Sequence, residues 1–253
     1  MKLTVAIITY NEEKNIERCL QSILKIADEI LVVDSFSTDQ TEEICKRHNV
    51  RFIKNPFAGH IEQKNFALDL AQGDYVLSLD ADEALDANLL AEISKLKEAG
   101  FKASGYRFKR LTHYVDQWIW HCGWYPDKKL RLVKKGSARW QGVNPHDILK
   151  LQDGSAEVEL QGNLLHYSYH SIADHINQTN KFTTIAALAS YQKGVRSSVF
   201  KIVTRPVLKF LRDYFYKLGF LDGRYGFIIC CINALSALLK YGKIYDLQRK
   251  TES

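Results

Sequence analysis

Two aspartates separated by one residue directly follow an apolar run of the sequence. Asp80-Ala81-Asp82 comes after residues 75–79, which have the composition of a buried strand. Carboxylates at this spacing can bind a hard divalent cation that substrate phosphates share. Such a cation neutralises the charge that develops when a bond to a diphosphate breaks. We therefore predict an Mg²⁺ or Mn²⁺ site with Asp82 and Asp80 as ligands; helix capping is the alternative, because Asp is common at helix starts.

A third carboxylate closes another apolar run. Asp34 is the last residue of the run Glu29–Asp34, and the polar residues 35–41 follow it. A carboxylate accepts hydrogen bonds, and at a strand end it can bind a ribose hydroxyl or a uracil N–H. We predict such a ligand role for Asp34, whereas Asp39 in the following turn is better explained as a helix cap.

The elements before these carboxylates must position them. Short apolar runs alternate with amphipathic stretches, which is typical of successive strand–helix units. The predicted strands are Leu3–Thr9, Glu29–Asp34, Arg51–Lys54 and 75–79, and the predicted helices lie within 12–25, 38–48, 60–71 and 86–98. This alternation favours an α/β fold with a mainly parallel sheet, in which ligands bind at the carboxyl ends of strands. Thr9-Tyr10-Asn11-Glu12, Asp34 and Asp80-Ala81-Asp82 should therefore meet at one edge.

The basic charge of the chain is concentrated in its last quarter. Residues 190–253 carry twelve Lys and Arg against four Asp and Glu, a net charge of +8, whereas residues 1–189 carry −2. Within 199–218 apolar and basic residues form separate stripes at helical spacing, and Pro206 suits a first helical turn. We predict an amphipathic helix on an anionic membrane surface rather than a nucleic-acid interface. The uncharged residues 225–239 are short of the ~20 needed to span a bilayer, so they either enter the membrane or pack on the domain.

The cysteines and the first residues indicate a cytoplasmic protein. The five cysteines are scattered and lack the spacing of a disulfide framework or a zinc site, so a reducing compartment is expected. The first apolar run is too short for an export signal. Together with the basic tail, this predicts a peripheral protein on the inner face of the cytoplasmic membrane.

Three motifs carry a resemblance to a known family. Ile8-Thr9-Tyr10-Asn11-Glu12, residues 32–41 and Asp80-Ala81-Asp82 have the order and approximate spacing found in family 2 glycosyltransferases, which the first hundred residues resemble. Further along, residues 124–132, His146-Asp147 and 219–223 are similar to the lipopolysaccharide-core β-1,4-glucosyltransferases.

The resemblance implies a GT-A fold, a UDP-sugar donor, usually UDP-glucose, and an inner-core heptose acceptor on a growing lipid. It also implies a GT-A domain over 1–190, with a nucleotide-sugar half over 1–100 and an acceptor half over 101–190, followed by a helical membrane-associating tail over 191–253. The family's donor residues correspond to Thr9, Tyr10 and Glu12 around the uridine, Asp34 at the nucleoside, Lys64 near the diphosphate, Asp80 at the ribose or metal, and Asp82 as the principal metal ligand.

The same resemblance implies an inverting transfer, which needs a base for the acceptor hydroxyl, and a carboxylate is the usual one. The candidate is Asp147, where the family has Glu after His. Asp127 is the alternative base and is also expected to bind the acceptor. His146 is expected near the metal, the diphosphate or the acceptor. Trp124 is expected in the acceptor site, since an aromatic face suits a sugar, although core packing explains most tryptophans equally well.

Other functions are compatible with parts of this pattern. A transferase that makes a polyprenyl-phosphate sugar or another cell-surface glycan is one, although such enzymes usually add spanning helices. A catalytically silent nucleotide-sugar binding protein is another, but both aspartates and a candidate base are present. The acidic strand ends argue against nucleic-acid binding, because they repel phosphates.

Overall fold

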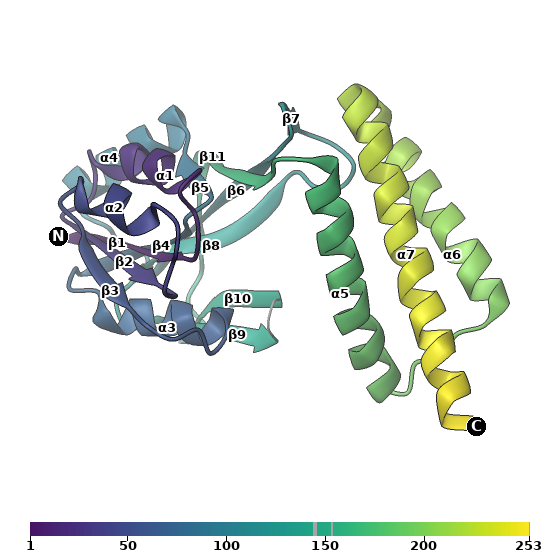
Figure 1. Ribbon diagram of the computed structural model, residues 1–253. Coiled ribbons are helices and arrows are strands. Elements are labelled where there is room, and N and C mark those ends of the chain that lie inside the picture. The colour runs from purple at the N-terminus through teal and green to yellow at the C-terminus, as the bar shows by residue number, and fades with distance from the viewer. Residues whose placement is uncertain (144–145, 153, 253) are drawn as a thin grey trace. The chain divides into compact units, whose positions relative to one another are not determined.

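The computed structural model describes residues 1–143, 146–152 and 154–252. The chain forms two compact units. Unit 1 comprises Met1–Leu111 and Asp127–Tyr167, and unit 2 comprises Thr112–Pro126 and Ser168–Ser253. These boundaries differ from the expected division at residue 190, because helix α5 (Ile172–Gln192) packs along the C-terminal helix α7 (Gly223–Glu252) (Figure 1).

A parallel four-stranded layer forms the N-terminal part of unit 1, as predicted. Its strands are β1 (Leu3–Thr9), β2 (Glu29–Asp34), β3 (Arg51–Lys54) and β4 (Tyr75–Asp80). The sheet runs in the order β3-β2-β1-β4-β8-β6-β11-β5, and β8 pairs antiparallel with both β4 and β6. The added strands are β5 (Glu83–Leu85), β6 (Gly105–Tyr114), β8 (Asp127–Lys134) and β11 (Val158–Tyr169). Strands from the expected acceptor half over 101–190 therefore continue the sheet that β1–β4 begin.

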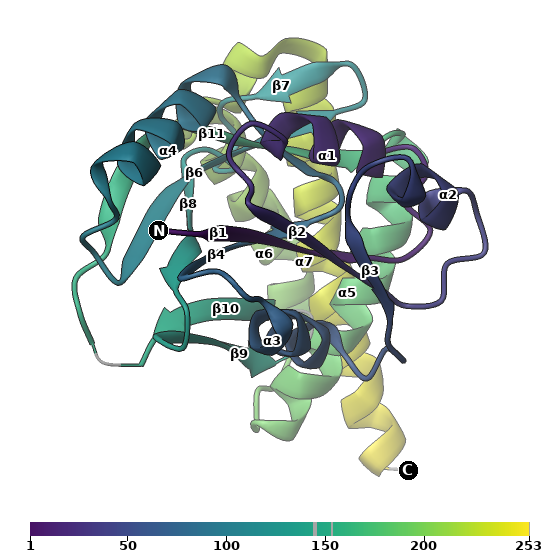
Figure 2. The ribbon, with the colours of Figure 1, turned by 90° about the vertical axis from the view of Figure 1, so that its left-hand side faces the viewer.

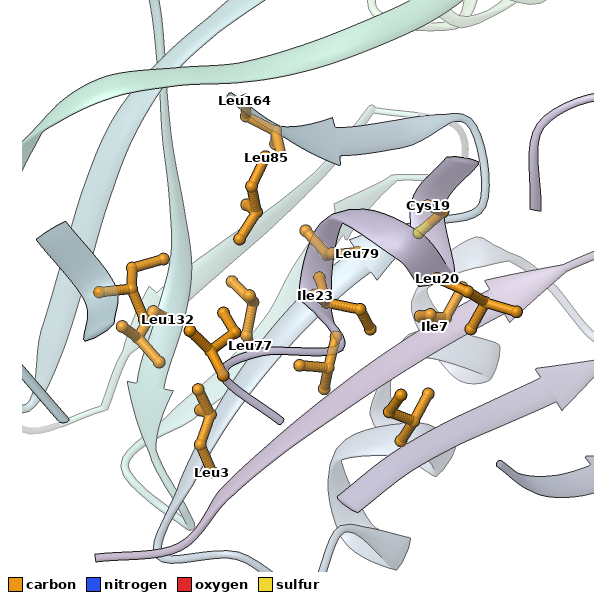
Figure 3. Packing of buried hydrophobic residues seen from close by; sticks show 14 of the residues in the cluster. Leu3, Ile7, Cys19, Leu20, Ile23, Leu77, Leu79, Leu85, Leu132 and Leu164 are labelled. Carbon is orange, nitrogen blue, oxygen red and sulfur yellow. The ribbon is translucent and has the colours of Figure 1, made fainter. Parts of the chain in front are cut away.

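The sheet of unit 1 is buried on both faces. Helices α1 (Ile16–Ile23) and α4 (Ala87–Ala99) cover one face, and α3 (His60–Leu70) with the hairpin of β9 (Ala138–Val143) and β10 (His146–Leu151) covers the other (Figure 2). Successive residues of a strand point to opposite faces. Alternate β1 residues therefore pack into different clusters: Leu3 and Ile7 lie with the α1 residues (Figure 3), whereas Ala6 lies with those of α3. Helix α2 (Thr41–Lys46) follows β2.

Helices dominate unit 2. After α5 come α6 (Val199–Leu211), a π-helical turn η1 (Arg212–Tyr216), a 3₁₀ turn η2 (Gly219–Asp222) and α7, and the short strand β7 (Gln117–Ile119) pairs with the end of β6. The prediction for Pro206 is wrong: it lies in the interior of α6, where proline cannot donate the backbone hydrogen bond.

The predicted apolar stretch 225–239 is part of a longer helical segment. The helical segment Gly219–Lys250 is long and apolar enough to cross a membrane, judged by length and composition alone. Tyr225, Ile229 and Cys230 nevertheless pack with Tyr114 and Ile119 in a buried cluster of unit 2. The argument from length against a spanning helix therefore fails, while part of the stretch does pack on the protein.

Candidate active site

The three polar strand ends meet at one edge of the sheet, as predicted. Strand β1 pairs with β2 so that Thr9 lies beside Asp34, and with β4 so that Ile8 lies beside Asp80. All three strands run parallel and end at the same side. The loops that follow β1 and β2 are joined: Asn11 Oδ1 accepts from the Thr38 N–H at 2.8 Å, and Thr41 Oγ1 accepts from the Glu12 N–H at 2.8 Å.

Asp34 is fully buried at the end of β2 and is held by the turn after it. Its carboxylate accepts hydrogen bonds from the Ser37 N–H and hydroxyl. Thr9 is also buried, and its hydroxyl has no hydrogen-bond partner among the described residues. Tyr10 is exposed beside them. Asp39 accepts from the N–H groups of Glu13 and of Thr41 at the start of α2, which is a structural role, although the N-cap residue of α2 is Gln40 and not Asp39.

The aspartates of Asp80-Ala81-Asp82 do not cap a helix. Helix α4 begins at Ala87, and its N-cap is Asp86, whose carboxylate accepts from the Leu89 N–H at 2.7 Å. The capping alternative is therefore wrong for Asp80 and Asp82. Their side chains remain about one quarter exposed, 25% for Asp80 and 23% for Asp82, so both are accessible to a ligand.

Two buried cations hold Asp80. Lys64 Nζ lies 3.0 Å from Asp80 Oδ1, and Arg131 Nη2 lies 3.2 Å from Asp80 Oδ2. Burial alone would raise the pKa of Asp80, but the charges of Lys64 and Arg131 outweigh it and hold the pKa well below its ordinary value. Arg131 also binds the fully buried Glu83 at 2.8 Å, and Glu83 accepts from the Asp80 N–H at 3.0 Å. The cations and Glu83 fix the position of Asp80.

Asp82 pairs with His166 from β11, whose Nε2 lies 3.2 Å from Asp82 Oδ2. Burial raises the pKa of Asp82, and the charge and hydrogen bond of His166 lower it by more. His166 was not predicted as a site residue. No spacing in the sequence links it to Asp82; the antiparallel pairing of β11 with β5, in which His166 lies opposite Glu83, brings it to the site.

Glu12 shows that negative charge accumulates at this edge. Its pKa is raised from 4.5 to about 7, first by burial and then by the nearby charges of Asp82, Asp39 and Asp80. A hydrogen bond from Asn15 opposes this shift. The pKa of Glu12 therefore lies far above those of Asp80 and Asp82, which are lowered.

The candidate base Asp147 reaches the same site from the β9–β10 hairpin. Asp147 Oδ2 lies 2.8 Å from Lys64 Nζ, so this lysine joins Asp147 to Asp80. The ring of Trp140, on β9, lies 4.3 Å from the Lys64 ammonium and 4.9 Å from the Arg131 guanidinium. Trp140 and Arg131 were not predicted as site residues. Both lie in the second half of unit 1, and only the docking of the hairpin on α3 brings Trp140 beneath Lys64.

Of the remaining predicted residues, Asp127 is linked to this edge by Arg110, which also lies 3.8 Å from Glu83, whereas Trp124 is not part of unit 1. Asp127, at the start of β8, is bound by Arg110 at 2.8 Å and Lys129 at 3.0 Å. Burial raises the pKa of Asp127, and these two cations lower it by more. Trp124 belongs to unit 2, where its ring contacts those of Tyr114, Tyr169 and His175. The His146 side chain lies outside the described residues.

This fold and site define a class of protein. A parallel sheet followed by antiparallel strands, with acidic residues gathered at the carboxyl ends of β1, β2 and β4, is the GT-A arrangement. The profile of Glycosyl transferase family 2 matches residues 4–141, and the chain belongs to that family.

Similar proteins cover almost the whole chain. The lipopolysaccharide core biosynthesis glycosyltransferase LpsC of Rhizobium meliloti (strain 1021) is 30% identical, over 97% of this chain and 93% of that protein. An uncharacterised glycosyltransferase of Rickettsia typhi is 31% identical, over 100% of this chain and 89% of that protein.

Among solved structures, S. aureus TarS 1–349 in complex with UDP is 15% identical. It aligns with a TM-score of 0.45 over 99% of this chain and 92% of that one. Glucosyl-3-phosphoglycerate synthase from Mycobacterium tuberculosis in complex with Mn²⁺ and UDP-glucose is 24% identical, with a TM-score of 0.36 over 44% of each chain.

Proposed function

We propose that this protein is a metal-dependent, inverting glycosyltransferase that moves a hexose, glucose in the first instance, from a UDP-sugar to a heptose of the lipopolysaccharide inner core. The near full-length similarity to LpsC supports the acceptor class. The observation that carries the enzymatic part is the chain of ion pairs from Asp80 through Lys64 to Asp147, because it joins the donor edge of the sheet to a candidate base.

The donor's uridine would lie between the loops after β1 and β2. Asp34 is buried and oriented by Ser37, and the Thr9 hydroxyl is buried with no partner in the described parts of the chain. Both can bind the polar edges of a nucleoside, and the exposed ring of Tyr10 can stack on its base. Glu12 supplies a further acceptor, or a donor when it is protonated.

A divalent cation fits the carboxylates at this edge. Within residues 1–143, 146–152 and 154–252, no three His, Cys, Asp or Glu side chains lie close enough to hold a metal ion by themselves. Asp82 and Asp80 are accessible oxygen donors. The pKa of Glu12 is raised first by burial and then by the charges of Asp82, Asp39 and Asp80, and a cation would offset those charges. Mg²⁺ and Mn²⁺ accept a few carboxylate oxygens together with substrate phosphates. When bound, the cation would stabilise the diphosphate as it leaves.

Asp147 is the proposed base. It would accept the proton of the acceptor hydroxyl as the hydroxyl oxygen attacks the anomeric carbon and UDP departs from the opposite face. Asp127, the alternative, is bound by two cations, Arg110 and Lys129, which lower its pKa, whereas Asp147 has one ion pair among the described residues, with Lys64. His146 and Trp124 remain proposals for acceptor binding.

Unit 2 offers a surface for an anionic membrane. Every residue of α6 is at least partly exposed. The large apolar residues exposed on α6 and the turns after it are Val199, Phe200, Val203, Val207, Leu208, Leu211, Phe215, Tyr216, Leu218, Phe220 and Leu221. Basic residues accompany them, although Lys209 and Arg212 both bind Asp213. Each free Lys or Arg near an anionic leaflet contributes about 1 kcal/mol. We propose peripheral attachment at the inner face of the cytoplasmic membrane, where a lipid-linked acceptor is made.

The test is a screen of UDP-sugars for metal-dependent hydrolysis, followed by transfer to lipid A-core with heptose at its terminus and, separately, to polyprenyl phosphate. We expect UDP-glucose to be used with Mn²⁺ or Mg²⁺, and a product whose mass increases by one hexose on the heptose acceptor. Transfer to polyprenyl phosphate alone would contradict the acceptor class, and equal activity with a chelator would contradict the role of the metal.

A further inference from the structure

Lys64 joins two carboxylates that have different tasks in the proposed reaction. Its ammonium lies 3.0 Å from Asp80 and 2.8 Å from Asp147, and only 6% of the side chain is exposed. The Trp140 ring faces the same ammonium at 4.3 Å. An ammonium has three N–H donors, and these three groups surround it. A further anion that binds Lys64 would therefore compete with these groups.

Asp147 is the partner that can be displaced. Asp80 is held independently of Lys64, because Arg131 binds its carboxylate at 3.2 Å and Glu83 accepts its backbone N–H. In the part of the chain that the structure describes, Asp147 has one ion pair, and that pair is with Lys64. Loss of the Lys64 contact thus leaves Asp80 bound to Arg131 and Asp147 without an ion pair among the described residues.

We propose that Lys64 is an electrostatic latch on Asp147. Before the donor binds, Lys64 occupies the carboxylate that the proposed function assigns as the base. The diphosphate of the nucleotide sugar then attracts the ammonium away, and Asp147 becomes free to accept a proton. This inference rests on the proposed function and adds an order to it, in which the donor binds before the acceptor is activated.

The sugar transfer that follows forms one bond, breaks one bond and moves one proton. The acceptor oxygen forms a bond to the anomeric carbon, and the bond from that carbon to the diphosphate oxygen breaks with its electron pair leaving on UDP. The hydroxyl proton passes to the freed Asp147. Without a donor, Asp147 remains paired and activates no hydroxyl.

The hairpin that carries Asp147 stays attached when the latch opens. The side chain of Asn65, next to Lys64 on α3, accepts from the backbone N–H of Trp140 and donates to the backbone carbonyl of Trp140, both at 3.0 Å. Asp69 of α3 and Arg139 of β9 form a second link, which is largely exposed. Opening the latch therefore frees one carboxylate without detaching β9.

The latch predicts that a substitution of the proposed base, Asp147, increases the affinity for UDP. Because UDP must break the Lys64–Asp147 pair in order to bind, Asp147→Asn should bind UDP about five- to tenfold more tightly than the unmodified protein in calorimetry with Mn²⁺, within the range for coupled charged neighbours. In a Lys64→Gln background, which has no latch, the same Asp147→Asn change should leave UDP affinity unaltered. Lys64→Met replaces Lys64→Gln if the latter does not fold by circular dichroism.

Asp69→Asn is the matched control, since it removes an equal charge from the same α3–β9 contact away from the site, and it should not change UDP affinity. The latch is refuted if Asp147→Asn binds UDP no more tightly, or if the gain persists without Lys64, which would indicate simple repulsion between Asp147 and UDP. Either result leaves the proposed function standing. If the unmodified protein binds no UDP, the proposed function fails, and the latch fails with it.

Discussion

Replacement of Arg131 should destabilise unit 1 more than the loss of any surface ion pair does. Arg131 is 3% exposed and binds two carboxylates, Glu83 at 2.8 Å and Asp80 at 3.2 Å. At an effective dielectric constant of about 20, a pair of unit charges 2.8 Å apart attract by about 6 kcal/mol. Desolvation offsets part of this attraction, but without Arg131 the fully buried Glu83 keeps only the longer ion pair with Arg110, at 3.8 Å, among the described residues. We expect Arg131→Met to lower the free energy of unfolding by about 3–5 kcal/mol.

Urea unfolding at pH 7, followed by circular dichroism, measures this loss. Arg139→Met is the control, because Arg139 forms an exposed ion pair with Asp69 in the same unit, and its loss should cost less than about 1 kcal/mol. In the double variant Arg131→Met/Glu83→Gln, much of the stability should return, since the buried charge is removed with its partner. A loss below about 1 kcal/mol for Arg131→Met, or no recovery in the double variant, would refute the reasoning about buried charge.

Three further predictions concern the acidic edge and unit 2. Asp82→Ala should abolish the dependence of UDP affinity on Mn²⁺ in calorimetry, and a persistent Mn²⁺ effect would exclude Asp82 as the principal ligand. Because Glu12 binds its proton more tightly in the folded protein than in the unfolded chain, stability should fall as the pH rises from about 4.5 to about 7. Glu12→Gln should flatten that part of the unfolding profile, and an unchanged slope would assign it to another group. Truncation after residue 195 should abolish sedimentation with anionic vesicles, and Phe215→Ser with Leu208→Ser should weaken it several-fold while leaving UDP binding intact. Equal sedimentation of these variants would remove α6 and η1 from that role.

The sequence by itself determined the donor edge of the site. Apolar runs that end in Thr9, Asp34 and Asp80 were sufficient to predict strands, because a buried parallel strand needs continuous apolar residues. Once the strands are parallel, their carboxyl ends must lie together, so the convergence of these residues required no tertiary detail.

The tertiary structure decided which residues act on that edge. Arg131, Trp140 and His166 come from strands far along the chain, where their types and spacing match ordinary core or surface positions. The docking of the β9–β10 hairpin on α3 brings Asp147 to Lys64, and the pairing of β11 with β5 brings His166 to Asp82. Contacts between distant segments depend on the register and packing of whole elements, which local sequence patterns do not encode. The same limit explains the wrong prediction for Pro206. Helical periodicity predicted the exposed face of α6, but the first residue of the helix follows from its N-cap, Ser198.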